Sequence, residues 1–181
     1  MIPVGYMLKR VLARPSWIKT DSVADIFAVS PCCSENFTDY FSYWRHNGFW
    51  LFNKPSDMDY IVAREGISRD GLKLFYYEVY ERQFDEDEIR WSNFAPDASF
   101  VTNAEKPRTA RLEGFDVVSF ASGTSPACSP LSCNSLADEL PVNPHCLFET
   151  FQEARDALDA GRFNNSEPGP FRIFSVYSVD A

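Results

Sequence analysis

Runs of apolar residues predict strands that are spread along the whole chain. Residues 4–14 (VGYMLKRVLAR) alternate around a basic centre and end at Pro15, which predicts an opening strand. The run LKLFYYEVY at 72–80 is rich in β-branched and aromatic residues, and four consecutive apolar positions within it indicate a strand covered on both faces. We expect this run to be the central strand of a sheet. Further strands are predicted at 26–29, 49–52, 115–120 and 171–179.

Three segments have the pattern of helices, and each has a start or stop signal. Aromatic residues at helical spacing predict a helix over 34–46, which the following Asn-Gly pair ends. A second helix is predicted over 56–65, before a glycine. Thr150 and Glu153 form a capping box, in which both side chains satisfy free backbone donors, at the start of a third helix that runs to residue 160. One further helical turn is predicted over 135–140.

The order of these elements lacks strict βαβ alternation. It therefore predicts an α+β fold, a mostly antiparallel sheet with about three helices packed on it, in a single domain spanning residues 1–181. Residues 83–113 are expected to be polar and irregular, with the acidic run Asp85–Glu88 at a solvated hairpin tip. We find no internal repeat and no linker in the sequence.

Composition and charge narrow the functional classes. The net charge of −9, from 17 basic and 26 acidic residues, disfavours nucleic-acid binding because it repels phosphate, and it suits a basic protein partner. No window has the apolar length of a membrane span, and the basic pair Lys9-Arg10 follows the apolar N-terminal residues, unlike in a signal peptide. Five cysteines, an odd number, are expected to be reduced thiols. These features predict a cytoplasmic protein.

The loop at 122–147 carries most of the candidate chemistry. Zinc sites need thiolate or imidazole ligands that converge tetrahedrally, and Cys128, Cys133 and Cys146 could supply them, with Cys32 or Cys33 as a further ligand. The spacing of these residues is looser than in most zinc motifs. The alternative is that they are buried free cysteines that pack as small apolar residues.

A second hypothesis for the same loop is a cysteine nucleophile. Cys128 or Cys133 could be activated by His145 or His46, and backbone N–H groups of the turn at 135–140 could lower the thiol pKa and form an oxyanion hole. The catalytic candidates are therefore Cys128, Cys133 and His145. The competing interpretation is structural: His46 would cap a helix end and His145 would hydrogen-bond in a turn.

Four sequence blocks resemble a bacterial protein family to which no activity is assigned. They are HNGFWLF (46–52), CSPLSCN (128–134), NPHCL (143–147) and EPGPFRIFSVY (167–177). The resemblance implies a bacterial, intracellular protein, and it brings no catalytic residue, cofactor or partner to carry over.

Two functional hypotheses follow. The first is a protein-binding module of immunity or antitoxin type, in which an acidic, aromatic-bearing surface steers a basic partner into place. The alternative is a cysteine-dependent enzyme or a small zinc-binding protein that uses the 122–147 loop. Whether the protein is an enzyme stays open at this stage.

Overall fold

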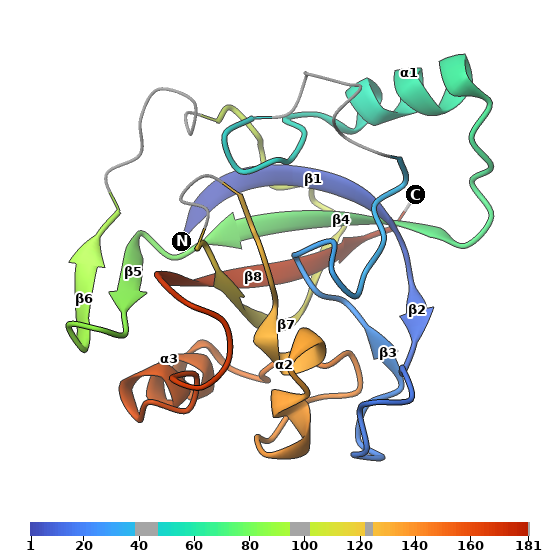
Figure 1. Ribbon diagram of the computed structural model, residues 1–181. Helices are drawn as coiled ribbons and strands as arrows, with labels where there is room; N and C mark the ends of the chain where they lie inside the picture. The colour runs from blue at the N-terminus through green and yellow to red at the C-terminus, as the bar shows by residue number, and fades with distance from the viewer. Residues whose placement is uncertain (39–46, 95–101, 122–124, 181) are drawn as a thin grey trace.

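The computed structural model describes residues 1–38, 47–94, 102–121 and 125–180 (Figure 1). Its strands are β1 (Ile2–Arg10), β2 (Leu12–Ala13), β3 (Asp25–Ile26), β4 (Leu72–Val79), β5 (Arg82–Asp85), β6 (Arg90–Asn93), β7 (Ala110–Ser119) and β8 (Phe171–Val179). Its helices are α1 (Pro55–Glu65), α2 (Pro130–Cys133), the 3-10 turn η3 (Leu136–Asp138) and α3 (Phe151–Asp159).

The main sheet is built around β8. Its strand order is β1-β4-β8-β5-β6, and β7 pairs with β8 along the opposite edge. Each of these pairings is antiparallel. The α+β class with a mostly antiparallel sheet is therefore confirmed. The run at 72–80 lies inside the sheet as expected, between β1 and β8, although β8 is the more central strand.

The two longer helices lie on different sides of the sheet. In Figure 1, α1 lies above the strands, and α3 lies below them. α1 buries Met58, Ile61 and Val62 in one hydrophobic cluster, and α3 buries Ala154 and Leu158 in a second one. The predicted capping box of α3 is present, since Thr150 accepts a hydrogen bond from the Glu153 amide and the Glu153 carboxylate accepts one from the Thr150 amide.

Three predicted elements differ from the structure. Most of the expected helix at 34–46 falls on residues 39–46, outside the described residues, and Asn36 forms a β-bridge with Lys9 instead of a helical turn. The expected strand at 49–52 is a turn that contributes one β-bridge, between Phe52 and Tyr6. The prediction of an irregular segment over 83–113 is wrong at both ends. β5 and β6 form a hairpin with the acidic run at its tip, as predicted for that run, and β7 begins at Ala110.

The structure contains an internal repeat that the sequence did not reveal. One unit is β1, a tight turn at 47–52, α1 and β4, and the other is β7, a tight turn at 143–148, α3 and β8. We call residues 2–79 the first half and residues 110–179 the second half. In both halves the first strand pairs antiparallel with the last. β4 and β8 join the halves, and Tyr77 pairs there with its equivalent, Val176.

The two turns have the same hydrogen bonds. The Asn47 amide nitrogen donates to the Leu51 carbonyl at 2.7 Å, and the Asn143 amide donates to the Leu147 carbonyl at 2.8 Å. Each Asn side chain also donates to a carbonyl of the first strand, Val4 in the first half and Glu113 in the second. The remaining positions of the two turns carry side chains that differ in chemistry between the halves. This difference explains why the repeat is hard to recognise in the sequence.

A glycine on the first strand of each half allows the turn to approach. Gly5 has φ +136° and Gly114 has φ +148°, values that L side chains rarely adopt. A Cβ on Gly5 would lie 2.7 Å from the Phe52 carbonyl oxygen, and one on Gly114 would lie 2.6 Å from the Phe148 carbonyl oxygen. The register of each strand pair also shifts immediately before its glycine. These two glycines therefore fix where the turns pack.

Candidate metal centre

Four cysteines, two from each half, meet at one place. Cys32 and Cys33 follow β3 in the first half. In the second half, Cys128 forms a β-bridge with Ser119 at the end of β7, and Cys133 is the last residue of α2. Pro130 starts α2, where a missing amide hydrogen costs nothing, and this short helix returns Cys133 toward Cys128.

Three of the sulfur atoms have the separations of a thiolate metal site, and a fourth contacts one of them. The Sγ atoms of Cys32, Cys128 and Cys133 all lie within 4.8 Å of one another. The Cys33 Sγ lies 3.6 Å from the Cys133 Sγ. Four sulfurs bound tetrahedrally to zinc are about 3.8 Å apart, given a Zn–S bond of about 2.3 Å. All five cysteines are free thiols, so no disulfide occupies this place.

Cys133 is the hub of the cluster. Hydrogen bonds from the Cys128 and Cys33 thiols strongly lower the pKa of Cys133, against the effect of its burial. The same hydrogen bonds to Cys133 raise the pKa of Cys128 and of Cys33. Burial raises the pKa of Cys32 to about 11. Cys133 therefore ionises most easily, and the neighbouring thiols donate hydrogen bonds to it. A bound cation would displace the thiol protons, so that all four cysteines would be thiolates.

A buried carboxylate fixes the second-half segment against the first-half segment. Asp116, on β7, is 1% exposed. Its Oδ2 accepts hydrogen bonds from the Val29 amide at 2.8 Å and from the Ser129 hydroxyl at 2.6 Å. The same hydroxyl accepts a weak hydrogen bond from the Ser30 amide at 3.3 Å. Asp116 and Ser129 thus hold together the two segments from which the cysteines come.

A buried lysine holds the first-half segment from beneath. Lys9, on β1, is 1% exposed, and its Nζ donates to the carbonyls of Ala28, Val29 and Ser30 at 2.6, 2.8 and 3.0 Å. All three ammonium hydrogens are therefore used. Burial lowers the pKa of Lys9 to about 7, and the negative charges of Asp116, Cys133 and Cys33 oppose this shift. Burial likewise raises the pKa of Asp116 to about 7, against its hydrogen bonds from Ser129 and Val29.

The centre lies at the protein surface beside a hollow. Cys32 is exposed and Cys133 is partly exposed, whereas Cys33 and Cys128 are buried. A hollow of about 260 Å³ borders both cysteine segments, with Pro31, Trp50 and Ala127 among its walls. Cys32 is thus the most solvent-exposed of the four cysteines.

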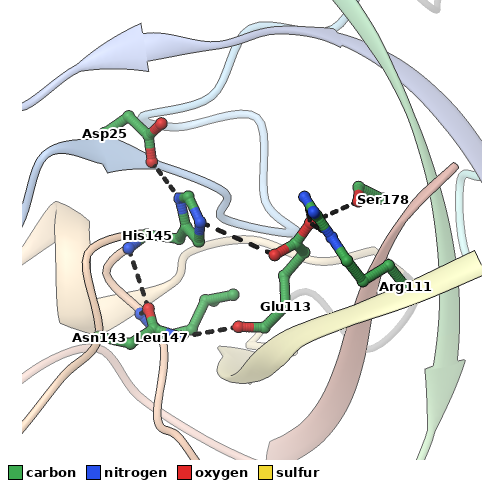
Figure 2. A network of polar contacts seen from close by, with 7 residues as sticks. All are labelled: Asp25, Arg111, Glu113, Asn143, His145, Leu147 and Ser178. Carbon is green, nitrogen blue, oxygen red and sulfur yellow. Dashed lines mark hydrogen bonds and ion pairs between the residues drawn. The ribbon is translucent and has the colours of Figure 1, made fainter. Parts of the chain in front are cut away.

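His145 belongs to a different polar network (Figure 2). Its Nδ1 lies 2.5 Å from an Asp25 carboxylate oxygen, and its Nε2 lies 3.7 Å from the Glu113 Oε2. Its ring stacks on Phe27, with the centroids 4.0 Å apart. The other Glu113 oxygen accepts hydrogen bonds from Ser178 and Arg111. Both imidazole nitrogens thus face carboxylates, and the ring offers no base to the candidate nucleophiles Cys128 and Cys133.

Cys146 does not join the thiol cluster. Among the described residues, the group of mutually close sulfurs contains Cys32, Cys128 and Cys133, and Cys33 lies outside it but contacts Cys133. Cys146, predicted as a ligand, is not in the group. Cys146 is buried in the second-half turn at φ +61°, and burial raises its pKa. His46, the other candidate base, lies outside the described residues.

The two buried charges beneath the cluster, Lys9 and Asp116, were not predicted from the sequence. The available signal was a charged residue inside an apolar strand: Lys9 in YMLKRV and Asp116 in GFDVVSF. Charged residues are rarely fully buried unless they are paired, so such positions indicate a structural or functional network.

Comparison of the chain with protein-family models, curated proteins and solved structures finds no match. The resemblance to a bacterial family therefore stays a prediction. Within the described parts of the chain, no helix has the length and apolar character needed to cross a membrane.

Proposed function

We propose that this protein is a zinc protein in which Cys32, Cys33, Cys128 and Cys133 hold one Zn²⁺. The supporting observation is that the sulfurs of Cys32, Cys128 and Cys133, from two distant segments, lie within 4.8 Å of one another, and that the Cys33 sulfur lies 3.6 Å from that of Cys133. Sets of four thiolates select zinc or iron over harder cations, and zinc needs no redox partner. The ion would replace the thiol–thiol hydrogen bonds around Cys133.

The role of the ion would be to join the two halves. Cys32 and Cys33 belong to the first half, and Cys128 and Cys133 to the second. A metal clip that closes such a long loop restricts the unfolded chain, in the way a disulfide does, and is expected to add about 3–5 kcal/mol to the free energy of unfolding. Four protein ligands leave no open position for substrate, which favours a structural centre over a catalytic one.

The test is metal analysis of the native protein combined with single substitutions. We expect one equivalent of zinc in the purified protein, and a Co²⁺-substituted form with the absorption of tetrahedral thiolate coordination. Cys128→Ser and Cys133→Ser should each abolish stoichiometric binding. Cys146→Ser is the matched control, because it removes another buried thiol and should retain one equivalent of metal.

Two results would contradict the proposal. One is native protein that contains no metal and takes up neither Zn²⁺ nor Co²⁺ after reduction. The other is equal loss of metal in Cys146→Ser and Cys133→Ser, because Cys146 lies outside the cluster.

A cysteine-dependent activity is the second candidate, supported by the hydrogen bond that Cys133 accepts from the Cys33 thiol at 3.6 Å, which contributes to lowering the pKa of Cys133. It predicts that iodoacetamide alkylates Cys133 fastest in zinc-free protein at neutral pH, because the thiolate is the reacting species. Alkylation of all thiols at ordinary rates would remove this candidate. His145 is not required for it, because the imidazole faces Asp25 and Glu113.

Binding of a basic protein partner stays a prediction. The acidic run has partners within the chain: Asp85 accepts from the Glu88 amide, Glu86 from the Gly169 amide, and Glu88 pairs with Arg90. These contacts occupy carboxylates that a partner would otherwise meet. The geometry therefore favours the metal centre as the site to test first.

A further inference from the structure

Resting on the zinc centre proposed above, we infer that Lys9 is its internal counter-charge and sets its affinity for the ion, and that Asp116 acts in the opposite direction. Four thiolates and one divalent cation carry two net negative charges. A charge of this size beside a protein interior needs a compensating positive group. Lys9 is buried and supplies a positive charge when it is protonated, and its position on β1 places it under the segment that leads into Cys32.

The position of the ammonium group is fixed by its contacts. Its three hydrogen bonds go to three consecutive carbonyls, at residues 28–30, so the side chain cannot turn away from the cysteines that follow. Cys33 and Cys133 lie close enough for their charges to act on Lys9. The second half has an apolar residue, Val118, at the equivalent strand position, so the fold itself does not require a cation there.

Asp116 provides a built-in comparison of the opposite sign. It contacts both cysteine segments, through the Val29 amide and the Ser129 hydroxyl, and it is negatively charged when ionised. Its other oxygen, Oδ1, is buried and has no hydrogen-bond partner among the described residues. An asparagine can therefore keep the acceptor on the Oδ2 side while the charge is removed.

An effect of charge can be separated from an effect of structure, because the two predict different directions of change in zinc affinity for the two variants. Lys9→Met leaves three carbonyls without their donor, and Asp116→Asn disturbs a buried network, so each variant should lower the free energy of unfolding of the zinc-free protein. If the two residues acted only through structure, both variants would weaken zinc binding. If they act through charge, Lys9→Met weakens binding and Asp116→Asn strengthens it.

The experiment is competition for Zn²⁺ between the reduced full-length protein and a chromogenic chelator at fixed pH. We expect the dissociation constant to rise about tenfold to a hundredfold in Lys9→Met and to fall by up to about tenfold in Asp116→Asn, the range of effects found for groups beside metal ligands. Arg172→Met is the control, since it removes a buried guanidinium that stacks on the Phe94 and Phe120 rings. Its zinc affinity should be unchanged.

Absorption spectra of the Co²⁺-substituted variants distinguish a change in affinity from a change in the ligands of the ion. Unchanged band positions in both variants would show that the four sulfurs still bind the ion and that only the affinity has moved. Weaker zinc binding in both variants, or no change in either, would overturn the inference that Lys9 is the counter-charge of the zinc centre. If Lys9→Met does not fold, Asp116→Asn decides alone, since tighter binding supports the inference and equal or weaker binding overturns it.

Failure of the proposed function has a different signature. In that case the wild-type protein itself does not compete for Zn²⁺, whatever the variants do. A wild-type protein that binds zinc with an affinity equal to that of Lys9→Met would leave the zinc centre in place and remove only the role of Lys9.

Discussion

The two halves of the molecule share a backbone and differ in chemistry. Both place a glycine on the first strand, an asparagine at the start of a tight turn and a Leu-Phe pair at its end. The residue two positions after the glycine is Met7 in the first half and Asp116 in the second. At the bulge before the glycine the first half has Val4 and the second has Glu113.

This difference shows which residues determine the fold and which serve the contact between the halves. The shared residues satisfy backbone groups of the turn or allow close approach. The second-half carboxylates, in contrast, reach first-half groups: Asp116 binds the Val29 amide, and Glu113 lies beside the imidazole that contacts Asp25. These polar residues therefore lie where one half meets the other, and the thiol cluster lies at the same junction.

The largest effects are expected at the two glycines. Gly5→Ala and Gly114→Ala each place a Cβ within 3 Å of a turn carbonyl oxygen, at a backbone conformation that alanine avoids. We expect each to lower the free energy of unfolding by about 3 kcal/mol or more, measured by urea denaturation. Gly66→Ala is the control, because it has positive φ but open space, and should cost only about 1 kcal/mol. Unequal losses at Gly5 and Gly114 would mean that the two turns do not support the fold equally.

Substitutions of the two turn asparagines should cause the next largest losses of stability. Asn143 accepts from the amides of His145 and Leu147 at 2.9 and 3.2 Å and donates to the Glu113 carbonyl at 2.7 Å. Asn143→Ala should lower the free energy of unfolding by about 2–4 kcal/mol, because buried backbone groups lose their partners. Asn143→Asp keeps the acceptor and loses the donor, so its loss should be smaller. Asn47→Ala should match Asn143→Ala if the repeat holds energetically, and a negligible loss would contradict it.

Glu113 should make the stability of the second half depend on pH. Burial by itself raises the pKa of Glu113, but hydrogen bonds from Ser178 and Arg111 outweigh it and bring the pKa below its usual value of 4.5. A pKa that is lower in the folded state gives stability that is present above the unfolded-state pKa and lost as the pH falls through the folded-state pKa. Glu113→Gln should therefore cost about 1–2 kcal/mol at pH 7, and less at pH values below about 4.5.

The equivalent residue of the first half provides the control for this titration. Val4 has no ionisable group, so the loss caused by Val4→Ala should be the same at every pH in this window. Urea denaturation of both variants between pH 3 and pH 7 (about the range in which an ordinary carboxyl titrates) measures the difference. A loss in Glu113→Gln that is independent of pH would show that the carboxylate contributes only through its packing.

Local signals in the sequence were sufficient for the elements that form locally. The capping box of α3, the glycine after α1 and the acidic tip of the β5–β6 hairpin were all predicted, because neighbouring residues alone determine them. The apolar run at 49–52 was predicted as a strand and is a turn, because its role is to cover β1 through a single bridge. Its pattern does not distinguish these two ways of being buried.

The candidate site could be predicted only in part, for a physical reason. Cys128 and Cys133 are near one another in the sequence, and their presence in one site was expected. Cys32 or Cys33 was predicted only as a further ligand. That Cys32 joins the group, that Cys33 contacts Cys133 and that Cys146 stays outside depend on how the two halves pack, which the spacing of cysteines does not encode. The repeat was missed for a related reason: few residues determine the turn, and the residues at its other positions differ between the halves.

The smallest effect is expected where the second-half turn is made to resemble the first. His145 occupies the position of Phe49, and both amides donate to the asparagine side chain at 2.9 Å. His145→Phe removes a partly exposed pair with Asp25 but can retain the stacking on Phe27, so the free energy of unfolding should change by less than about 1 kcal/mol at pH 7. Asp25→Asn should give a change of the same size in the same urea titration. Zinc content should be unaffected in both variants, because the imidazole contacts carboxylates and not the four thiols. A loss of several kcal/mol, or loss of zinc, would show that the second turn needs its histidine in a way that the first turn does not need its phenylalanine.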